Sequence, residues 1–178
     1  EIKYLKERWN VQYVRFFDEV FIGSKYRIRA LCEAMIEEEL NVFWWCQTQV
    51  RLIDEDLLKV MKKAGCIEIA DGVESGSDVM LEDMKKGITS DIIRDILEAT
   101  NRANIRITLN LLAGTPAETV DTLKETRDFL ISLNHINWAN VPNIEFVVPL
   151  PGTELFDTAV AEGLIEDPEL FVVEALAK

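Results

Sequence analysis

The sequence predicts an α/β fold in which parallel β-strands lie inside and helices outside. Short β-prone runs alternate with helical patterns along the chain, and the strand starts lie about 25–40 residues apart, the length of a βα unit. Five such strands follow a leading helical segment. Because βα crossovers are right-handed and place their helices on the outside, we expect an open, partial β/α barrel of the TIM type rather than a complete doubly wound domain.

Composition is that of a folded, acidic domain. The 178 residues suit one domain, with 48% hydrophobic and 29% charged residues. No apolar run approaches the roughly 18–20 residues that span a bilayer, and the first residues do not resemble a signal peptide, so we expect a cytoplasmic protein. The net charge of −13 argues against nucleic acid as a partner, because phosphate backbones are bound by Lys and Arg.

The first half of the chain begins with the end of a helix over residues 1–10. A strand is expected over residues 12–18, and it ends in the acidic pair Asp18 and Glu19. Ser24 is then a plausible N-cap. The helix that it opens has an apolar face at helical spacing, formed by Ile28, Leu31, Cys32, Met35, Ile36 and Leu40.

The second expected strand, residues 42–48, runs into the polar residues Gln47, Gln49 and Arg51. These three share one face if the strand stays regular, because side chains alternate along a strand. Asp54 is expected to cap a helix that closes at Gly65.

The third expected strand, residues 67–72, ends in a loop that carries Glu74 and Ser75 between two glycines. In parallel α/β folds, ligands bind where the carboxyl ends of strands meet such loops. The alternative is that the glycines only make the turn and that Ser77 only caps the next helix. The residues alone leave both interpretations open.

Helical patterns over residues 78–86 and 90–103 lead to a fourth strand, residues 105–112. Gly114 follows it, and we expect Thr115 as N-cap and Glu118 as N3 of a capping box that opens the next helix. That role makes Glu118 a cap more than a ligand. The fifth strand, residues 144–149, ends at Pro151, and the tail from residue 154 is helical.

The three cysteines, Cys32, Cys46 and Cys66, lie 14 and 20 residues apart, without a C-x-x-C pair. This spacing argues against a metal site built wholly within this chain. Cys32 and Cys66 are expected in the core.

Five segments in this order resemble the catalytic barrel of radical S-adenosylmethionine (SAM) enzymes. The resemblance covers nearly the whole chain and is greatest to the subgroup associated with cobalamin-binding domains, which includes anaerobic magnesium-protoporphyrin monomethyl ester cyclases. The segments are FFDEVF, WWCQTQVRLIDEDLLKVMKKAGC, GVESGS followed by MKKGIT, LLAGTPAET, and PLPGTEL.

The resemblance implies a partial barrel of six βα units. The family's first strand ends in a C-x-x-x-C-x-x-C loop that holds a [4Fe–4S] cluster, and this cluster binds SAM. That loop is missing here, and residues 1–10 match the helix that follows the first strand. We therefore expect residues 1–178 to be one domain, a barrel fragment whose tail begins near residue 154, and to be inactive alone.

The full-length parent is expected to be an oxidoreductase or a transferase. It would cleave SAM reductively to start radical chemistry on an unknown small molecule, with an electron donor such as flavodoxin or ferredoxin. A cobalamin cofactor is possible in the parent.

The resemblance also assigns cofactor-binding residues by position. Asp18 and Glu19 match the motif near the SAM amino group. Glu74 and Ser75 match a segment that contacts the ribose or methionine part of SAM. Gly114 with Thr115 matches the segment beside the adenine, and Pro151 matches the end that closes the site; the four earlier strand ends should converge on one rim.

Two positions depart from the family pattern Q-T-R-V-D: related sequences usually show Arg where this chain has Gln49 and Asp where it has Arg51. Gln49 cannot replace the charge of that Arg toward the SAM carboxylate. Arg51 lies two residues further on and is the candidate substitute.

Two rival classes of function remain: a non-catalytic α/β nucleotide-binding module and a protein-interaction module. The sequence has no G-x-G-x-x-G or G-x-x-x-x-G-K-[ST] motif, which weakens the first of these.

Overall fold

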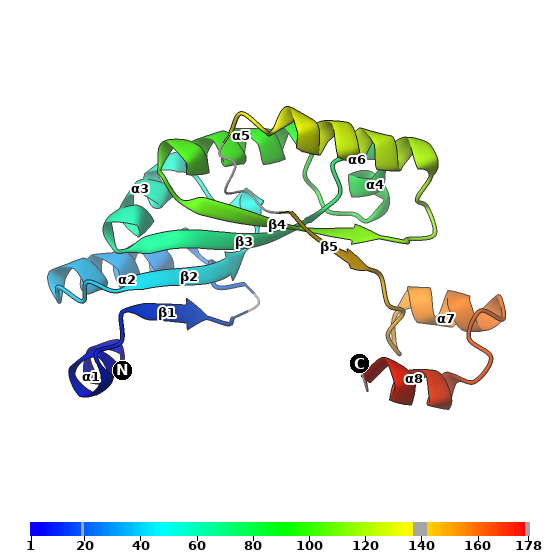
Figure 1. Cartoon of the computed structure of the whole chain (residues 1–178), viewed down its shortest axis with the longest axis horizontal. Coiled ribbons are helices and arrows are strands. Elements are labelled where there is room, and N and C mark those ends of the chain that lie inside the picture. The colour runs from blue at the N-terminus through cyan, green and yellow to red at the C-terminus, as the bar shows by residue number, and fades with distance from the viewer. Residues whose placement is uncertain (19, 137–141, 177–178) are drawn as a thin grey trace. The chain divides into compact units, whose positions relative to one another are not determined.

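The computed structural model describes residues 1–18, 20–136 and 142–176, and these form one β-sheet with its helices, followed by two further helices (Figure 1). The chain divides into two compact units, Glu1–Glu145 and Phe146–Lys178. The first unit carries the sheet. Each unit is described by itself below.

The first unit alternates strands and helices. Its elements are α1 (Ile2–Trp9), β1 (Tyr13–Phe16), α2 (Lys25–Glu37), β2 (Phe43–Thr48), the 3₁₀ turn η1 (Val50–Leu52), α3 (Glu55–Lys63), β3 (Cys66–Glu74), α4 (Asp78–Asp83), α5 (Ser90–Arg102), β4 (Arg106–Ala113), α6 (Val120–Ser132) and β5 (Pro142–Phe146), which ends at the boundary.

The five strands form one sheet in the order β1-β2-β3-β4-β5, so each strand lies beside its neighbour in the chain. The pairs β1–β2, β2–β3 and β3–β4 are parallel. An open sheet with sequential strands and βα crossovers is the wall of a β/α barrel. The predicted α/β partial barrel with five strands is therefore confirmed.

The core lies between the sheet and its helices. One row of side chains, Phe16, Cys46, Ile69 and Ile107, crosses four strands in register. The row packs into two apolar clusters, one with residues of α2 and α3 and the other with residues of α5 and α6. Figure 1 shows α5 and α6 running along the same side of the sheet. Burial of each large apolar side chain contributes roughly 1.5–3 kcal/mol.

Local signals explain where several helices begin and end. Ser24 caps α2 by accepting the Arg27 N–H (3.5 Å), and Asp54 caps α3 by accepting the Leu57 N–H (2.8 Å). Gly65 ends α3 with φ +98°, and a Cβ there would lie 2.1 Å from the Val42 carbonyl oxygen. Only glycine fits this close approach. These three predictions are confirmed.

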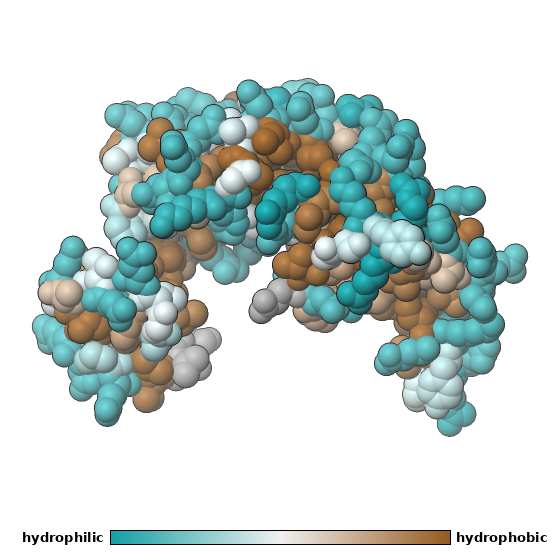
Figure 2. Space-filling model, turned by 180° about the vertical axis from the view of Figure 1, so that it is seen from behind, coloured by the Kyte–Doolittle hydropathy of each residue, from teal (hydrophilic) through white to brown (hydrophobic). Residues whose placement is uncertain are grey.

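The opposite face of the sheet is aromatic and polar. The Arg15 guanidinium lies over the rings of Trp45 (4.3 Å) and Phe17 (5.1 Å). Further along the sheet, Glu68 accepts from the Thr108 hydroxyl (3.0 Å) and pairs with Arg106 (3.5 Å). Phe17 is among the exposed aromatic residues. Figure 2 shows the molecule from behind, where apolar patches lie among hydrophilic residues.

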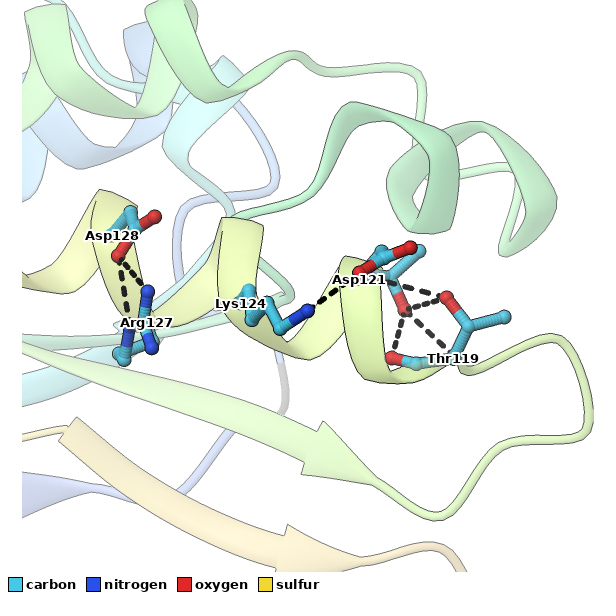
Figure 3. A network of polar contacts seen from close by, with 6 residues as sticks. Thr119, Asp121, Lys124, Arg127 and Asp128 are labelled. Atoms are coloured by element: carbon cyan, nitrogen blue, oxygen red, sulfur yellow. Dashed lines mark hydrogen bonds and ion pairs between the residues drawn. The ribbon is translucent and has the colours of Figure 1, made fainter.

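The predicted capping box at Thr115 is wrong. The chain first makes a turn in which the Glu118 N–H donates to the Thr115 carbonyl (3.0 Å), while the Glu118 carboxylate accepts the Gly114 N–H (3.1 Å). Helix α6 begins only at Val120, with Thr119 and Thr122 forming the capping box. Figure 3 shows Thr119 at the start of α6 and the pair Asp121–Lys124 (2.8 Å), which joins the first turn of the helix to the next.

Strand ends also differ from expectation. β1 ends two residues earlier than predicted and β5 three, whereas β3 continues to Glu74. β2 ends at Thr48, as predicted, and η1 follows, so the regular strand that would place Gln47, Gln49 and Arg51 on one face is absent.

The second unit contains α7 (Glu154–Ala161) and α8 (Pro168–Leu176). Thr153 caps α7 by accepting the Phe156 N–H (3.2 Å). The rings of Phe156 and Phe171 lie 6.2 Å apart and pack the two helices together.

Candidate functional site

A cavity lies at the carboxyl ends of β2 and β3. Its volume is about 220 Å³, and it is formed by the turn after β2, the end of β3 and the loop after α4. The lining residues are Gln49, Val50, Arg51, Asp71, Gly72, Lys85, Lys86 and Ile88. Cavities at this edge of parallel sheets are the usual ligand sites, because loops of several βα units meet there.

Gln49 and Arg51 meet in this cavity although β2 does not continue to Arg51. The 3₁₀ turn at residues 50–52 bends the chain back, and the Arg51 Nε donates to the Gln49 Oε1 (2.7 Å). The contact orients the guanidinium, whose terminal nitrogens have no partner among the described residues. The structure therefore places a cation beside Gln49.

Glu74 stands at the end of β3 in a left-handed conformation, with φ +67°. Its Oε1 pairs with the Lys86 Nζ (3.2 Å), and both side chains are mostly buried. A Cβ on Gly72 would lie 2.5 Å from the same Oε1, so a glycine there lets the carboxylate fold back over the strand. Such backbone strain costs about 1–3 kcal/mol and clusters at functional sites.

Lys86 is a residue that the sequence analysis did not select. It lines the cavity together with Lys85, and its ammonium group pairs with the Glu74 carboxylate. The segment MKKGIT contributed to the family resemblance, but nothing in its local pattern indicates that its lysines return to the end of β3.

Asp71 is the second cavity residue to which the sequence assigned no binding role, although it belongs to the same polar strand end as Glu74. It is only 2% exposed, and burial raises its pKa to about 7. Two effects partly oppose this rise, the charge of Lys86 and a hydrogen bond from the Val50 backbone, while the charge of Glu74 adds to it. The Asp71 Oδ2 has no hydrogen-bond partner among the described residues.

Ser75 and the glycine after it hold the loop against α6. The Ser75 Oγ lies 2.9 Å from the Thr126 Oγ1, which also accepts the Gly76 N–H (3.2 Å). A Cβ on Gly76 would lie 2.6 Å from the Phe129 ring. The hydroxyl of Ser75 is thus engaged within the fold.

Ser77 does not cap α4 through its side chain. Its hydroxyl instead donates to the Glu125 carboxylate of α6. The alternative in which Ser77 only caps the helix is therefore wrong. Gly72 lies within β3, so the expectation that both glycines make the turn is wrong as well, and only Gly76 belongs to the turn that follows the strand.

Of the predicted residues in the described part of the first unit, only Gln49 and Arg51 line this cavity. Asp18 is exposed two residues beyond β1, and Glu19 lies outside the described residues. Gly114 has φ +84°, and the Thr115 Oγ1 has no partner among the described residues. Pro151 belongs to the second unit and is exposed.

The cysteines do not fit an iron–sulfur cluster. All three are buried, and burial raises the pKa of the Cys32 thiol to about 11, that of Cys46 to about 12 and that of Cys66 well above its usual value. Cluster ligands are thiolates, which this environment disfavours. Over the described residues, no group of three or more His, Cys, Asp or Glu could hold a metal ion.

The charges of the cavity fit a zwitterion such as the methionine part of SAM. Arg51 and Lys86 line the cavity and can pair with a carboxylate, and Glu74, which pairs with Lys86, can accept from an ammonium group.

No helix among the described residues is long and apolar enough to cross a membrane.

Fold and site together define a parallel βα barrel wall with a charged cavity at the carboxyl ends of two of its strands. The sequence model of the radical SAM superfamily matches residues 1–130 of this chain. The chain therefore belongs to this superfamily. This membership disfavours the alternative of an unrelated nucleotide-binding or interaction module.

The chain is also similar to several individual proteins. It is 27% identical to an uncharacterized methyltransferase of Pyrococcus horikoshii, over 93% of this chain and 35% of that protein. It is 28% identical to the anaerobic magnesium-protoporphyrin IX monomethyl ester cyclase of Rubrivivax gelatinosus, over 88% and 28%. Among solved structures, it resembles the radical SAM methyltransferase TsrM of Kitasatospora setae with cobalamin and a [4Fe–4S] cluster bound, with a TM-score of 0.74, 19% identity and coverage of 84% and 30%. The chain thus spans about a third of the length of these proteins.

Proposed function

We propose that this chain forms the SAM-binding part of a radical SAM enzyme core. The observation that supports this most is the cavity at the ends of β2 and β3, which Arg51 and Lys86 line and where Lys86 pairs with the neighbouring carboxylate of Glu74. Family membership supplies the class of ligand, and the cavity supplies groups of matching charge.

In this proposal, Arg51 and Gln49 act as one unit. The terminal nitrogens of Arg51 bind the carboxylate of SAM, while Gln49 holds the guanidinium through its Nε. Glu74 exchanges part of its contact with Lys86 for a polar group of SAM. Asp18, Glu19, Ser75, Gly114, Thr115 and Pro151 keep the roles that their family positions suggest, as further parts of the proposal.

The cluster ligands are proposed to lie outside these 178 residues. The buried cysteines support this, as does the fact that the chain matches about a third of its curated relatives. In the whole protein, a reduced [4Fe–4S] cluster would supply the electron that cleaves SAM, and a flavodoxin or ferredoxin would reduce the cluster. A cobalamin cofactor and the small-molecule substrate would belong to the whole protein as well.

The test is SAM binding by the full-length protein after anaerobic cluster reconstitution, measured by equilibrium dialysis. Arg51→Gln should weaken SAM binding about tenfold or more, as expected when a charge-assisted hydrogen bond of roughly 1.5–3 kcal/mol is lost. Arg27→Gln is the matched control, because Arg27 is exposed on α2, away from the cavity. Equal affinities for the two variants would refute the role of Arg51, and absence of SAM binding by the wild type would refute the proposed function.

A further inference from the structure

The cavity at the end of β3 contains a buried carboxyl group among cations. Asp71 is 2% exposed and lines the cavity together with Arg51, Lys85 and Lys86. Lys86 pairs with Glu74, whereas Arg51 and Lys85 have no carboxylate partner among the residues that the structure describes. The ionisable groups around Asp71 therefore leave an excess of positive charge, which suits an anionic ligand group.

Two buried oxygens on neighbouring strands have no hydrogen-bond partner in the described part of the chain. They are the Oδ2 of Asp71 and the Oγ1 of Thr48, and these residues lie opposite each other in the β2–β3 register. Buried polar atoms are normally paired, so the unpaired Oδ2 needs an explanation. An ionised carboxylate can only accept hydrogen bonds, whereas a protonated carboxyl group can donate one.

We propose that Asp71 is a further binding residue of this site, and that its protonated carboxyl group donates a hydrogen bond from Oδ2 to the carboxylate of the ligand held by Arg51 and Lys86. The inference rests on the proposed function, in which that carboxylate belongs to SAM. It adds a donor that comes from the middle of a strand rather than from a loop.

The surroundings of Asp71 favour the neutral form that this role requires. Burial raises its pKa to about 7, and the nearby Glu74 carboxylate acts in the same direction. Lys86 opposes the rise, as the charges of Arg51 and Lys85 would. A bound carboxylate neutralises these cations and adds a negative charge beside Oδ2, so the ligand stabilises the proton on Asp71. Binding and proton uptake are then linked.

This linkage gives SAM binding a defined pH dependence. With a pKa near 7, Asp71 is mostly protonated at pH 6 and mostly ionised at pH 8, so the dissociation constant should rise about tenfold over this interval. Asp71→Asn carries a neutral amide that donates at every pH. The SAM affinity of this variant should therefore fall less steeply with rising pH than that of the wild type, because Asn at position 71 does not titrate.

The experiment is equilibrium dialysis of labelled SAM against the full-length, cluster-reconstituted protein at pH 6, 7 and 8. Wild type, Asp71→Asn and Asp95→Asn are compared, because Asp95 is an exposed aspartate on α5, away from the cavity. The amino group of SAM also titrates, so the decisive quantity is the difference in slope between the wild type and Asp71→Asn. We expect a steeper loss of affinity for the wild type and for Asp95→Asn.

Equal slopes for the wild type and Asp71→Asn would overturn the inference alone. Absence of SAM binding at every pH would refute the proposed function and the inference with it. Should Asp71→Asn not fold, calorimetry of the wild type in buffers of different ionisation enthalpy decides. More protons should be taken up from the buffer when the protein binds SAM than when it binds decarboxylated SAM, which lacks only the carboxylate. Equal proton uptake with the two ligands overturns the role of Asp71.

Discussion

Asp71→Asn should change how the stability of this protein depends on pH. The folded state holds the Asp71 proton up to about pH 7, whereas an unperturbed carboxyl group has a pKa of 3.8. The free energy of unfolding therefore contains a contribution that is fully present below about pH 4 and is lost as the pH rises to about 7. The direction is opposite to that of a carboxylate in an ion pair.

The magnitude follows from the size of the pKa shift. A rise from 3.8 to about 7 is about three units, and about 1.4 kcal/mol per unit gives on the order of 4 kcal/mol across the whole window. Asn has nearly the same shape and can still accept the Val50 N–H, but it does not ionise. The variant should therefore gain stability relative to the wild type as the pH rises.

Urea unfolding of the 178-residue chain between pH 4 and 8 measures this difference. The gap in the free energy of unfolding between Asp71→Asn and the wild type should widen steadily up to about pH 7 and then level off. Asp95→Asn controls for the loss of a carboxylate at an exposed position, and its gap should stay flat. A flat gap for Asp71→Asn would show that Asp71 is ionised throughout, and it would refute the reasoning from burial.

Three further predictions concern the loop after β3 and the cysteines. In the full-length protein, Glu74→Gln should lower SAM affinity about tenfold or more with a nearly unchanged melting temperature; a loss of stability with unaltered binding would make Glu74 structural. Gly76→Ala should destabilise the chain by about 1–3 kcal/mol in urea unfolding, because the new Cβ would lie 2.6 Å from the Phe129 ring. Gly23→Ala is the control and should leave the stability unchanged, because its Cβ would meet nothing closer than 3.9 Å. After anaerobic reconstitution, the 178-residue chain alone should contain no stoichiometric iron and should not cleave SAM, and a [4Fe–4S] absorbance spectrum would contradict the proposal that the cluster ligands lie elsewhere.

The sheet could be predicted because its signals are local and repeated. An apolar run followed by a helix cap indicates each βα unit, as at Ser24 and Asp54. Parallel pairing of the strands then follows from the length of the crossover. The start of α6 could not be predicted in the same way. Residues 115–118 have the Thr-x-x-Glu pattern of a capping box, whereas residues 119–122 do not. The helix instead uses Thr119 and Thr122, because Glu118 stabilises the preceding turn by accepting the Gly114 N–H.

The site was predictable at the level of the rim but not of its chemistry. Parallel strands bring their carboxyl ends to one edge, so Gln49, Arg51 and Glu74 could be expected there. Lys86 follows α4 by three residues and returns to the cavity through its contact with Glu74, a tertiary contact without a local signal. Asp71 has the opposite difficulty, because an aspartate near a strand end normally indicates a solvated turn, and only the packing around it makes it a buried acid.

The missing arginine at position 49 illustrates how charge can be supplied from elsewhere. An electrostatic interaction depends on the distance between charges and on their solvent exposure, and not on the strand position that carries the residue. In this chain, the turn at residues 50–52 brings Arg51 to Gln49, and the loop after α4 brings Lys86 to the same cavity. In the proposed site, Gln49 accepts from Nε, and the terminal nitrogens of Arg51 bind the ligand. We therefore expect the glutamine at position 49 not to weaken the proposed anion site, because two neighbouring elements bring Arg51 and Lys86 to the same cavity.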